Sequence, residues 1–240
     1  GGSFTVALAA AIVVFMMTKF ALPVSTTQAI VGAIIGWNLF TGNPTDATTL
    51  TNILSTWVSG PVLGAVFAVI LYILLKTVKR KSAIHLVRFE SYIRTGLIIV
   101  GAFGAYSLGA NNIANVMGVF VPAFNLHPLD LKLFTLSSQQ QLFLLGSLAI
   151  AAGIITYSRR VMEQVGNNIM ELSSESALVV VLSQALVLFI FSSSGLSAFL
   201  RNAGLPAIPM VPVSSTQVMI GSIIGIGLYS GARNINFRIL

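Results

Sequence analysis

Cysteine is absent from this 240-residue chain, and only 8% of its residues are charged. The absence of thiols excludes a disulfide framework, a thiolate nucleophile and a cysteine-based metal site. The scarcity of charge excludes an ordinary water-soluble domain, in which about 25% of residues are charged. The hydrophobic share of 55% and the mean hydropathy of +0.91 instead predict an all-α polytopic membrane protein in a lipid bilayer.

Residues that would suggest catalysis or nucleic-acid binding are also scarce. The two histidines, His85 and His127, lie in polar connections with no partner at metal-ligand spacing. No nucleophile motif or phosphate-binding loop is present, so we expect neither an enzyme nor a cofactor. The net charge of +7 gathers largely in one connection, which argues against nucleic acid as a partner.

One segment of the chain is present twice. Residues 23–39 read PVSTTQAIVGAIIGWNL and residues 212–228 read PVSSTQVMIGSIIGIGL, with ten of 17 positions identical. Each copy places hydroxyl groups and a glutamine directly before a short apolar helix. Polar groups are costly inside a membrane, and duplicated, interrupted apolar segments are typical of the binding sites of secondary transporters.

The basic residues predict the orientation of the chain in the membrane. Six of the 13 lie between Lys76 and Arg94. By the positive-inside rule, the connection formed by residues 76–92 is cytoplasmic. Residues 53–75 form a membrane-spanning helix that leads to this connection, and residues 142–157 form another that returns to the cytoplasmic side.

The two copies of the repeated segment fall in two predicted hairpins, residues 4–40 and 177–229. Charge counting opens the first hairpin to the outside and the second to the cytoplasm, which predicts an inverted-topology repeat with re-entrant helical hairpins. Their return arms, residues 29–40 and 218–229, are too short to cross the bilayer, so we expect the hydroxyl-bearing tips to lie within it.

A further polar segment interrupts the second repeat, which we assign to residues 93–240. Its first apolar stretch, residues 93–124, is interrupted by one glycine and three amides: Gly109, Asn111, Asn112 and Asn115. These residues predict a broken transmembrane helix that lines a cavity. Its free N–H groups would receive an anion and its carbonyls a small cation. The alternative role of the amides is hydrogen bonding between helices.

Several sequence motifs of the chain resemble those of a known family. GANNIAN at residues 109–115 resembles the GANDxxN signature of the inorganic phosphate transporter family, a group of sodium/phosphate symporters. PVSTTQ and PVSSTQ resemble its paired hairpin motifs, and VGNNIMEL at residues 165–172 resembles its VGKKIxxL motif. The resemblance covers most of the chain. It implies a plasma-membrane secondary transporter with two inverted repeats that imports an oxyanion, usually phosphate, together with sodium or protons by alternating access.

The resemblance also implies where substrate and ions bind. Both hairpin tips and the signature amides would form the pocket: Ser25, Thr26, Thr27, Gln28, Asn111, Asn112, Asn115, Ser214, Ser215, Thr216 and Gln217. Sodium would bind oxygen atoms of five of these residues: Asn111, Asn112, Asn115, Thr27 and Thr216.

One position departs from the family pattern, because Asn112 stands where the family has Asp. An amide oxygen can bind sodium but cannot carry a proton. All six acidic residues of the chain fall in predicted connections, so we expect no carboxylate relay within the membrane, which favours sodium over protons. These residues are Asp46, Glu90, Asp130, Glu163, Glu171 and Glu175.

Two other functions remain open from the sequence: a sulfate permease of the same family, and a passive anion channel or scaffold that has lost coupling. The oligomeric state is also open, with a homodimer as one arrangement. Residues 1–75 are interpreted as the remainder of the first repeat of an N-terminally truncated member. The offset between the copies predicts a matching signature about 80 residues before Gly1, with the Asp that Asn112 lacks.

Overall fold

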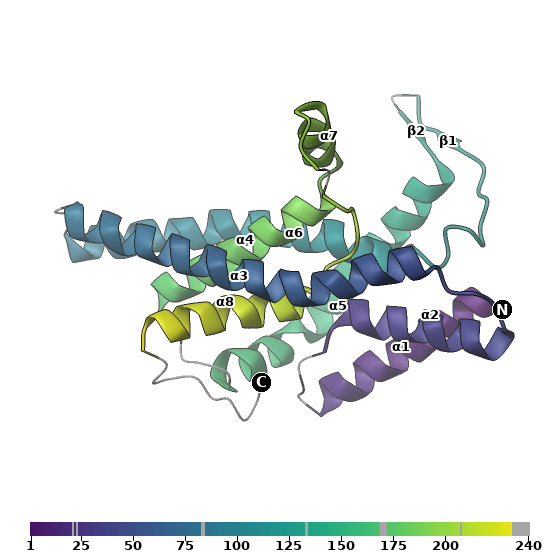
Figure 1. Ribbon diagram of the computed structural model, residues 1–240, viewed down its shortest axis with the longest axis horizontal. Helices are drawn as coiled ribbons and strands as arrows, with labels where there is room; N and C mark the ends of the chain where they lie inside the picture. The colour runs from purple at the N-terminus through teal and green to yellow at the C-terminus, as the bar shows by residue number, and fades with distance from the viewer. Residues whose placement is uncertain are drawn as a thin grey trace. The chain divides into compact units, whose positions relative to one another are not determined.

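The computed structural model describes residues 1–20, 22, 24–82, 85–132, 134–168, 172–206 and 208–231, with the backbone alone for residues 86 and 157–168. These residues form eight helices and one short β-hairpin, which confirms the all-α prediction in outline (Figure 1). The helices are α1 (Gly2–Lys19), α2 (Thr26–Thr41), α3 (Ala47–Lys81), α4 (Leu86–Met117), α5 (Ser138–Asn168), α6 (Ser174–Ser192), α7 (Ser194–Asn202) and α8 (Ser215–Tyr229). Strands β1 (Leu129–Asp130) and β2 (Thr135–Leu136) pair antiparallel.

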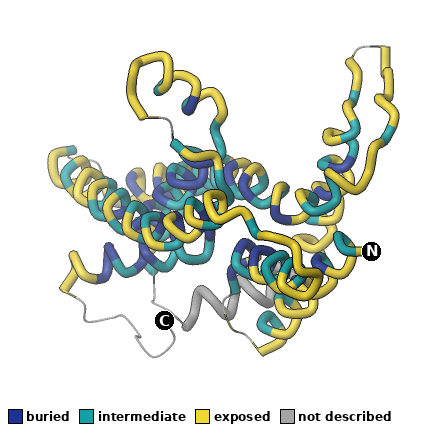
Figure 2. Tube along the Cα trace, turned by 45° about the vertical axis from the view of Figure 1, so that its right-hand side comes forward, coloured by how far each residue is buried: buried dark blue, intermediate teal, exposed yellow. Residues whose placement is uncertain are grey.

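Five of the described helices are long and apolar enough to cross a membrane, namely α1, α3, α4, α5 and α6. Most of their residues are exposed or half-buried (Figure 2), as expected for helices that face lipid. Helix α8 is apolar but has only 15 residues. The chain is therefore a multi-pass membrane protein, and the second copy of the repeat forms a shorter helix, as its length predicted.

The basic segment at residues 76–92 is largely helical rather than a loop. Helix α3 continues to Lys81 and α4 begins at Leu86. Lysine and arginine have high helix propensity and favour the last turn of a helix, where the backbone dipole is negative. At 35 and 32 residues, α3 and α4 exceed the roughly 20 residues that cross a bilayer, so their charged ends extend beyond the apolar layer.

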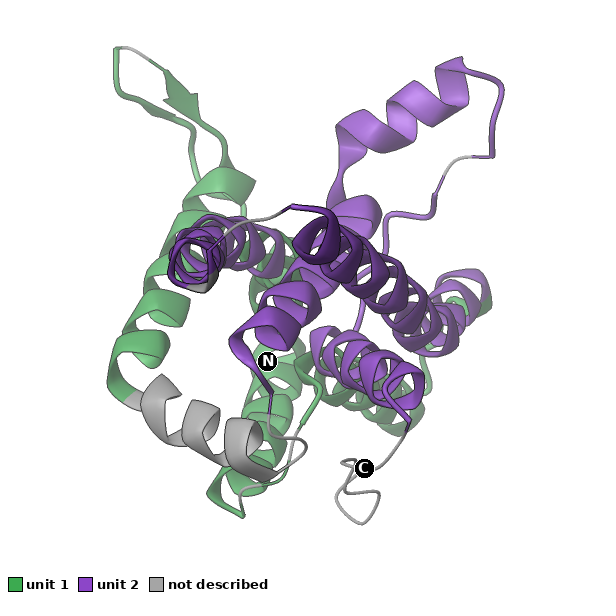
Figure 3. Cartoon of the chain, turned by 90° about the vertical axis from the view of Figure 1, so that its left-hand side faces the viewer, with its two compact units in different colours: residues 1–47, 109–164 green, residues 48–108, 165–240 purple. Residues whose placement is uncertain are grey.

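The chain forms two compact units that do not follow the repeat boundaries (Figure 3). The first unit contains residues 1–47 and 109–164, and the second contains residues 48–108 and 165–240. The first hairpin thus packs in one unit with the end of α4 and most of α5. The second hairpin packs in the other unit with α3 and the start of α4.

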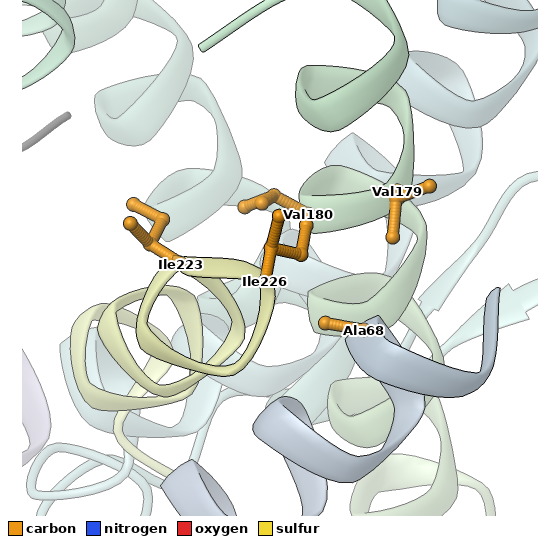
Figure 4. Close-up of a cluster of buried hydrophobic side chains, with 5 residues drawn as sticks. All are labelled: Ala68, Val179, Val180, Ile223 and Ile226. Carbon is orange, nitrogen blue, oxygen red and sulfur yellow. The ribbon is translucent and has the colours of Figure 1, made fainter. Parts of the chain in front are cut away.

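The core of the second unit lies where α3, α6 and α8 meet. Ala68, Val179, Val180, Ile223 and Ile226 form a buried apolar cluster there, each at most 3% exposed (Figure 4). A Cβ built on Gly225 would lie 2.7 Å from the carbonyl oxygen of Ala65, and one on Gly221 would overlap the carbonyl oxygen of Pro61. Glycine is therefore required on α8, since it lets this helix approach the backbone of α3.

The corresponding glycines of the first copy are in open surroundings. A Cβ on Gly32 or Gly36 of α2 would meet no atom within 4 Å. Helix α2 packs instead against α1 to complete the first hairpin. It ends at Gly42, whose φ of +71° is the left-handed conformation that glycine adopts readily.

The prediction that the helix is broken at residues 109–112 is wrong. Helix α4 is continuous from Leu86 to Met117 and includes Gly109 and all three asparagines. The chain leaves the helix only after Met117, in a series of turns at residues 118–123. Asparagine lowers helix stability by only about 0.7 kcal/mol relative to alanine, so these amides do not unwind the backbone when their side chains have other partners.

The glycine contacts of α8 yield a matched pair of variants. Gly221→Ala should destabilise the protein by about 1–3 kcal/mol, because the methyl group has no room against Pro61. Gly32→Ala, the same change at the equivalent position of the first copy, should be neutral or stabilising by up to about 1 kcal/mol through helix propensity. Thermal unfolding in detergent measures both. Equal stability of the two variants would contradict the α3–α8 packing.

Candidate functional site

Each copy of the repeated segment begins its helix with a serine cap. The hydroxyl of Ser25 accepts a hydrogen bond from the backbone N–H of Gln28 at 3.2 Å. Ser214 accepts one from the N–H of Gln217 at 3.3 Å. Serine is among the best residues for satisfying free N–H groups at a helix start, and S-x-x-Q is the spacing of a capping box. The first serine of each motif therefore fixes where its helix begins. The S-x-x-Q spacing could have predicted this role, which we did not infer from the sequence.

The tip of the first hairpin is hydrogen-bonded to the asparagines of α4. Asn115 Nδ2 donates to Thr27 Oγ1 at 2.9 Å and to Asn112 Oδ1 at 3.2 Å. Thr26 Oγ1 donates to the same oxygen of Asn112 at 3.4 Å. Thr27 and Asn115 are only 1% and 7% exposed, so the hydrogen bond between them lies where water has little access. We call these four residues the hydroxyl–amide network.

The helix ends around this network carry opposite partial charges. Helix α2 starts at Thr26 with its positive end, and α4 finishes at Met117, just beyond Asn115, with its negative end. Asn111, one turn before Asn115 on α4, is 3% exposed. An anion is favoured near the start of α2 and a cation near the end of α4. The expected anion site at a restarted helix within α4 is absent, because α4 has no interruption there.

The second hairpin tip has a different set of neighbours. Gln184, which lies on α6, donates from Nε2 to the backbone oxygen of Ser215 at 3.3 Å. Sequence reasoning missed Gln184, although a glutamine within the apolar run VVVLSQALVLF was a detectable signal. Ser214 is 1% exposed, whereas Ser215 and Thr216 are half-buried.

Two buried atoms beside this tip have no hydrogen-bond partner among the described residues, namely Gln217 Oε1 and Trp57 Nε1. They lie on α8 and α3, the helices whose residues Gly221 and Pro61 touch. The two helices run in the same direction, because Gly221 meets Pro61 and Gly225 meets Ala65 one turn later. Gln217 and Trp57 each precede the Gly221–Pro61 contact by four residues, about one helical turn. An unsatisfied acceptor and an unsatisfied donor therefore lie at the same level of one interface. Trp57 is a second polar group near the tip that the sequence reasoning did not select.

Thr26, Thr27, Asn112 and Asn115 form the hydroxyl–amide network without an acidic residue. Glu175 is in the first turn of α6 and forms an ion pair with Lys79 at the end of α3. Glu90 and Glu163 also lie in helices rather than in the predicted connections, because the helices extend further than expected. No group of three or more His, Cys, Asp or Glu that could hold a metal ion occurs among the described residues. The hydroxyl–amide network itself consists of neutral groups.

The structure brings together four of the predicted site residues in the first unit. It places the other hairpin tip, residues 214–217, in the second unit with Gln184 and Trp57 nearby. Gln28 follows the network on α2 and is half-buried. A single pocket formed by both tips stays a prediction.

The chain is similar to several archaeal membrane proteins. It is 26% identical over 302 aligned residues to a protein of Thermococcus kodakarensis named "Putative phosphate permease", with 98% of this chain and 71% of the relative covered. It is 27% identical over 238 residues to a protein of the same description from Methanocaldococcus jannaschii, with 99% of this chain and 67% of the relative covered.

A solved structure has the same fold. The chain matches "The sodium-dependent phosphate transporter" with a TM-score of 0.75 at 21% identity, covering 99% of this chain and 72% of that one. Residues 1–240 match the model of the phosphate transporter family. From its repeated hairpin motifs, its membrane helices and this match, the chain belongs to the phosphate transporter family.

Proposed function

We propose that this protein imports inorganic phosphate coupled to sodium by alternating access. The observation that carries the proposal is the hydroxyl–amide network, where the tip of a membrane hairpin is held by the signature amides of another helix. Membership of the phosphate transporter family and the solved sodium-dependent relative support it.

Phosphate would bind at the hairpin tips, where hydroxyl groups and the positive helix ends favour an oxyanion. The residues proposed for this role are Ser25, Thr26, Thr27, Gln28, Ser214, Ser215, Thr216 and Gln217. Hydroxyl and backbone N–H groups can hold an oxyanion without an arginine, and a hydroxyl can also accept a hydrogen bond from a protonated phosphate oxygen.

Sodium would bind oxygen atoms near the end of α4. A small hard cation prefers oxygen ligands, which amides, hydroxyls and backbone carbonyls provide. We propose Asn111, Asn112 and Asn115 for this role, together with Thr27 and Thr216. A sodium ion at Asn112 Oδ1 would replace the hydrogen bonds that this oxygen accepts from Thr26 and Asn115. Ion binding and the attachment of the hairpin tip are therefore linked in this proposal.

The two hairpins are attached in different ways, which gives alternating access a physical basis. The tip of the first hairpin meets α4 through side-chain hydrogen bonds, each of which contributes about 0.5–1.5 kcal/mol net. Helix α8 meets α3 through close glycine–backbone packing. We infer that the first tip detaches and reattaches more readily as ions bind and leave.

Asn115→Ala should lower the initial rate of sodium-driven phosphate uptake by about tenfold or more, because Thr27 and Asn112 lose a buried donor. Thr27→Val should have a similar effect, and the double variant should be little worse than Asn115→Ala, since both changes remove the Asn115–Thr27 hydrogen bond. Asn202→Ala, at the exposed end of α7, is the control. Labelled-phosphate uptake into proteoliposomes with equal amounts of folded protein is the measurement. Normal uptake by Asn115→Ala would refute the site.

Replacing sodium with choline at constant pH should abolish concentrative phosphate uptake, because the proposed cation site contains neutral oxygen ligands and no titrating group. An imposed proton gradient should not restore it. Unlabelled sulfate, added to the same proteoliposomes, tests the anion. Full uptake driven by protons without sodium would overturn the proposed coupling, and stronger inhibition by sulfate than by unlabelled phosphate would indicate a sulfate permease.

A further inference from the structure

The polar ends of three helices meet at one place in the second unit. Lys79 near the end of α3 forms an ion pair with Glu175 at the start of α6, and its ammonium lies 4.9 Å from the ring centroid of Phe89 on α4. Charged residues are costly in hydrocarbon, so this end lies at or beyond the headgroup region of the bilayer.

A groove lies beside this meeting point. It consists of two neighbouring cavities of about 350 and 320 Å³, which share Glu90 and Arg94 in their walls. Ser91 and Ser174 add polar groups, whereas the other lining residues of the larger cavity are apolar: Ile93, Leu97 and Ile98. After Arg94 the helix carries no charged residue up to its end at Met117, so the membrane-spanning part of α4 begins beyond Arg94. Leu97 and Ile98 therefore lie at the depth of acyl chains, and Glu90 and Arg94 lie at the depth of headgroups.

Neither Glu90 nor Arg94 forms an ion pair within the described part of the chain, although they are four residues apart on one helix. A Glu–Arg pair at this spacing contributes only about 0.3–0.5 kcal/mol at an exposed position. A ligand that carries both a cation and an anion can thus pair with Glu90 and Arg94 at a small cost in free energy, because their mutual attraction is weak. One carboxylate and one guanidinium complement a zwitterion better than a purely anionic group.

We propose that this groove binds one phosphatidylethanolamine molecule. Its phosphate would pair with the Arg94 guanidinium and accept a hydrogen bond from Ser174, and its ammonium would donate to the Glu90 carboxylate. Its acyl chains would lie along Leu97 and Ile98, the latter 69% exposed.

The order of the charges along α4 supports this headgroup. In the lipid, the phosphate is joined to the glycerol that carries the acyl chains, and the ammonium lies further from them. On α4, Arg94 is closer to the membrane-spanning part than Glu90 by four residues, or about 6 Å of helix. The separation and the direction of the two charges therefore both agree with the headgroup. Phosphatidylglycerol has no cation for Glu90, and the trimethylated ammonium of phosphatidylcholine has no N–H to donate.

The test uses the purified full chain in detergent, titrated with phosphatidylethanolamine, phosphatidylcholine or phosphatidylglycerol of identical acyl chains, with bound lipid counted by native mass spectrometry. The wild type should bind phosphatidylethanolamine about tenfold more tightly than either other lipid, since hydrogen bonds between charged groups are the strongest polar contacts available. Glu90→Gln should reduce this affinity to that for phosphatidylcholine. Arg94→Gln should weaken all three.

Two further variants separate the groove from the general basic surface. Arg88→Gln removes the same charge from the same helix outside both cavities and should bind lipid as the wild type does. Exchanging the charges, with Glu90→Arg and Arg94→Glu combined, keeps the composition but reverses the order and should abolish the preference. Equal wild-type affinity for the three lipids, tightest binding of phosphatidylglycerol, or an Arg88→Gln defect as large as that of Arg94→Gln would each overturn the proposal. The readout does not depend on transport.

Discussion

Polar groups in a membrane protein must be satisfied by other protein groups, and this constraint organises the first unit. Asn115 and Thr27 are both buried, and each has the other as a partner. Ser25 satisfies a free N–H group at the start of α2, which leaves the next two threonines at the entrance to the helix, facing the amides of α4. The repeated hydroxyl motif thus provides a cap and a docking contact from consecutive residues.

Two segments of similar sequence have unlike surroundings. The glycines of α8 are in contact with the backbone of α3, whereas the equivalent glycines of α2 have open space around them. The tip of α2 is bonded to asparagine side chains, and the tip of α8 receives a hydrogen bond from Gln184 of α6. A repeat in sequence specifies the local conformation, a capped short helix, but the neighbours depend on which other elements are present. The α3–α8 contact cannot slide without moving backbone against backbone, whereas the first tip meets α4 through side-chain hydrogen bonds.

The sequence predicted the short apolar helix that follows each hydroxyl motif, and it selected four residues that come together in the hydroxyl–amide network. It failed at α4, where Gly109 and three asparagines suggested an interruption and the helix continues. The reason is that a helical asparagine destabilises the helix only when its side chain competes with the backbone, and here Asn112 and Asn115 bond to each other and to the hairpin. Gln184 and Trp57 were missed because their importance depends on the register of α6 and α3 against α8, which local sequence does not contain.

The neutrality of the proposed site offers a physical origin for the proposed coupling of phosphate to sodium. The residues assigned to it are hydroxyls and amides, with no arginine to balance phosphate and, since Asn112 replaces an acid, no carboxylate there to balance sodium. An isolated ion in a desolvated neutral site loses more hydration free energy than the surrounding dipoles restore. Two ions of opposite charge, in contrast, attract each other strongly in a medium of low dielectric constant. Sodium would then supply the positive charge that stabilises phosphate, and phosphate the negative charge that stabilises sodium, because the protein groups there are neutral. Under this proposal phosphate would bind well only with sodium present, so cotransport would be a direct result of electrostatics in a site without formal charges.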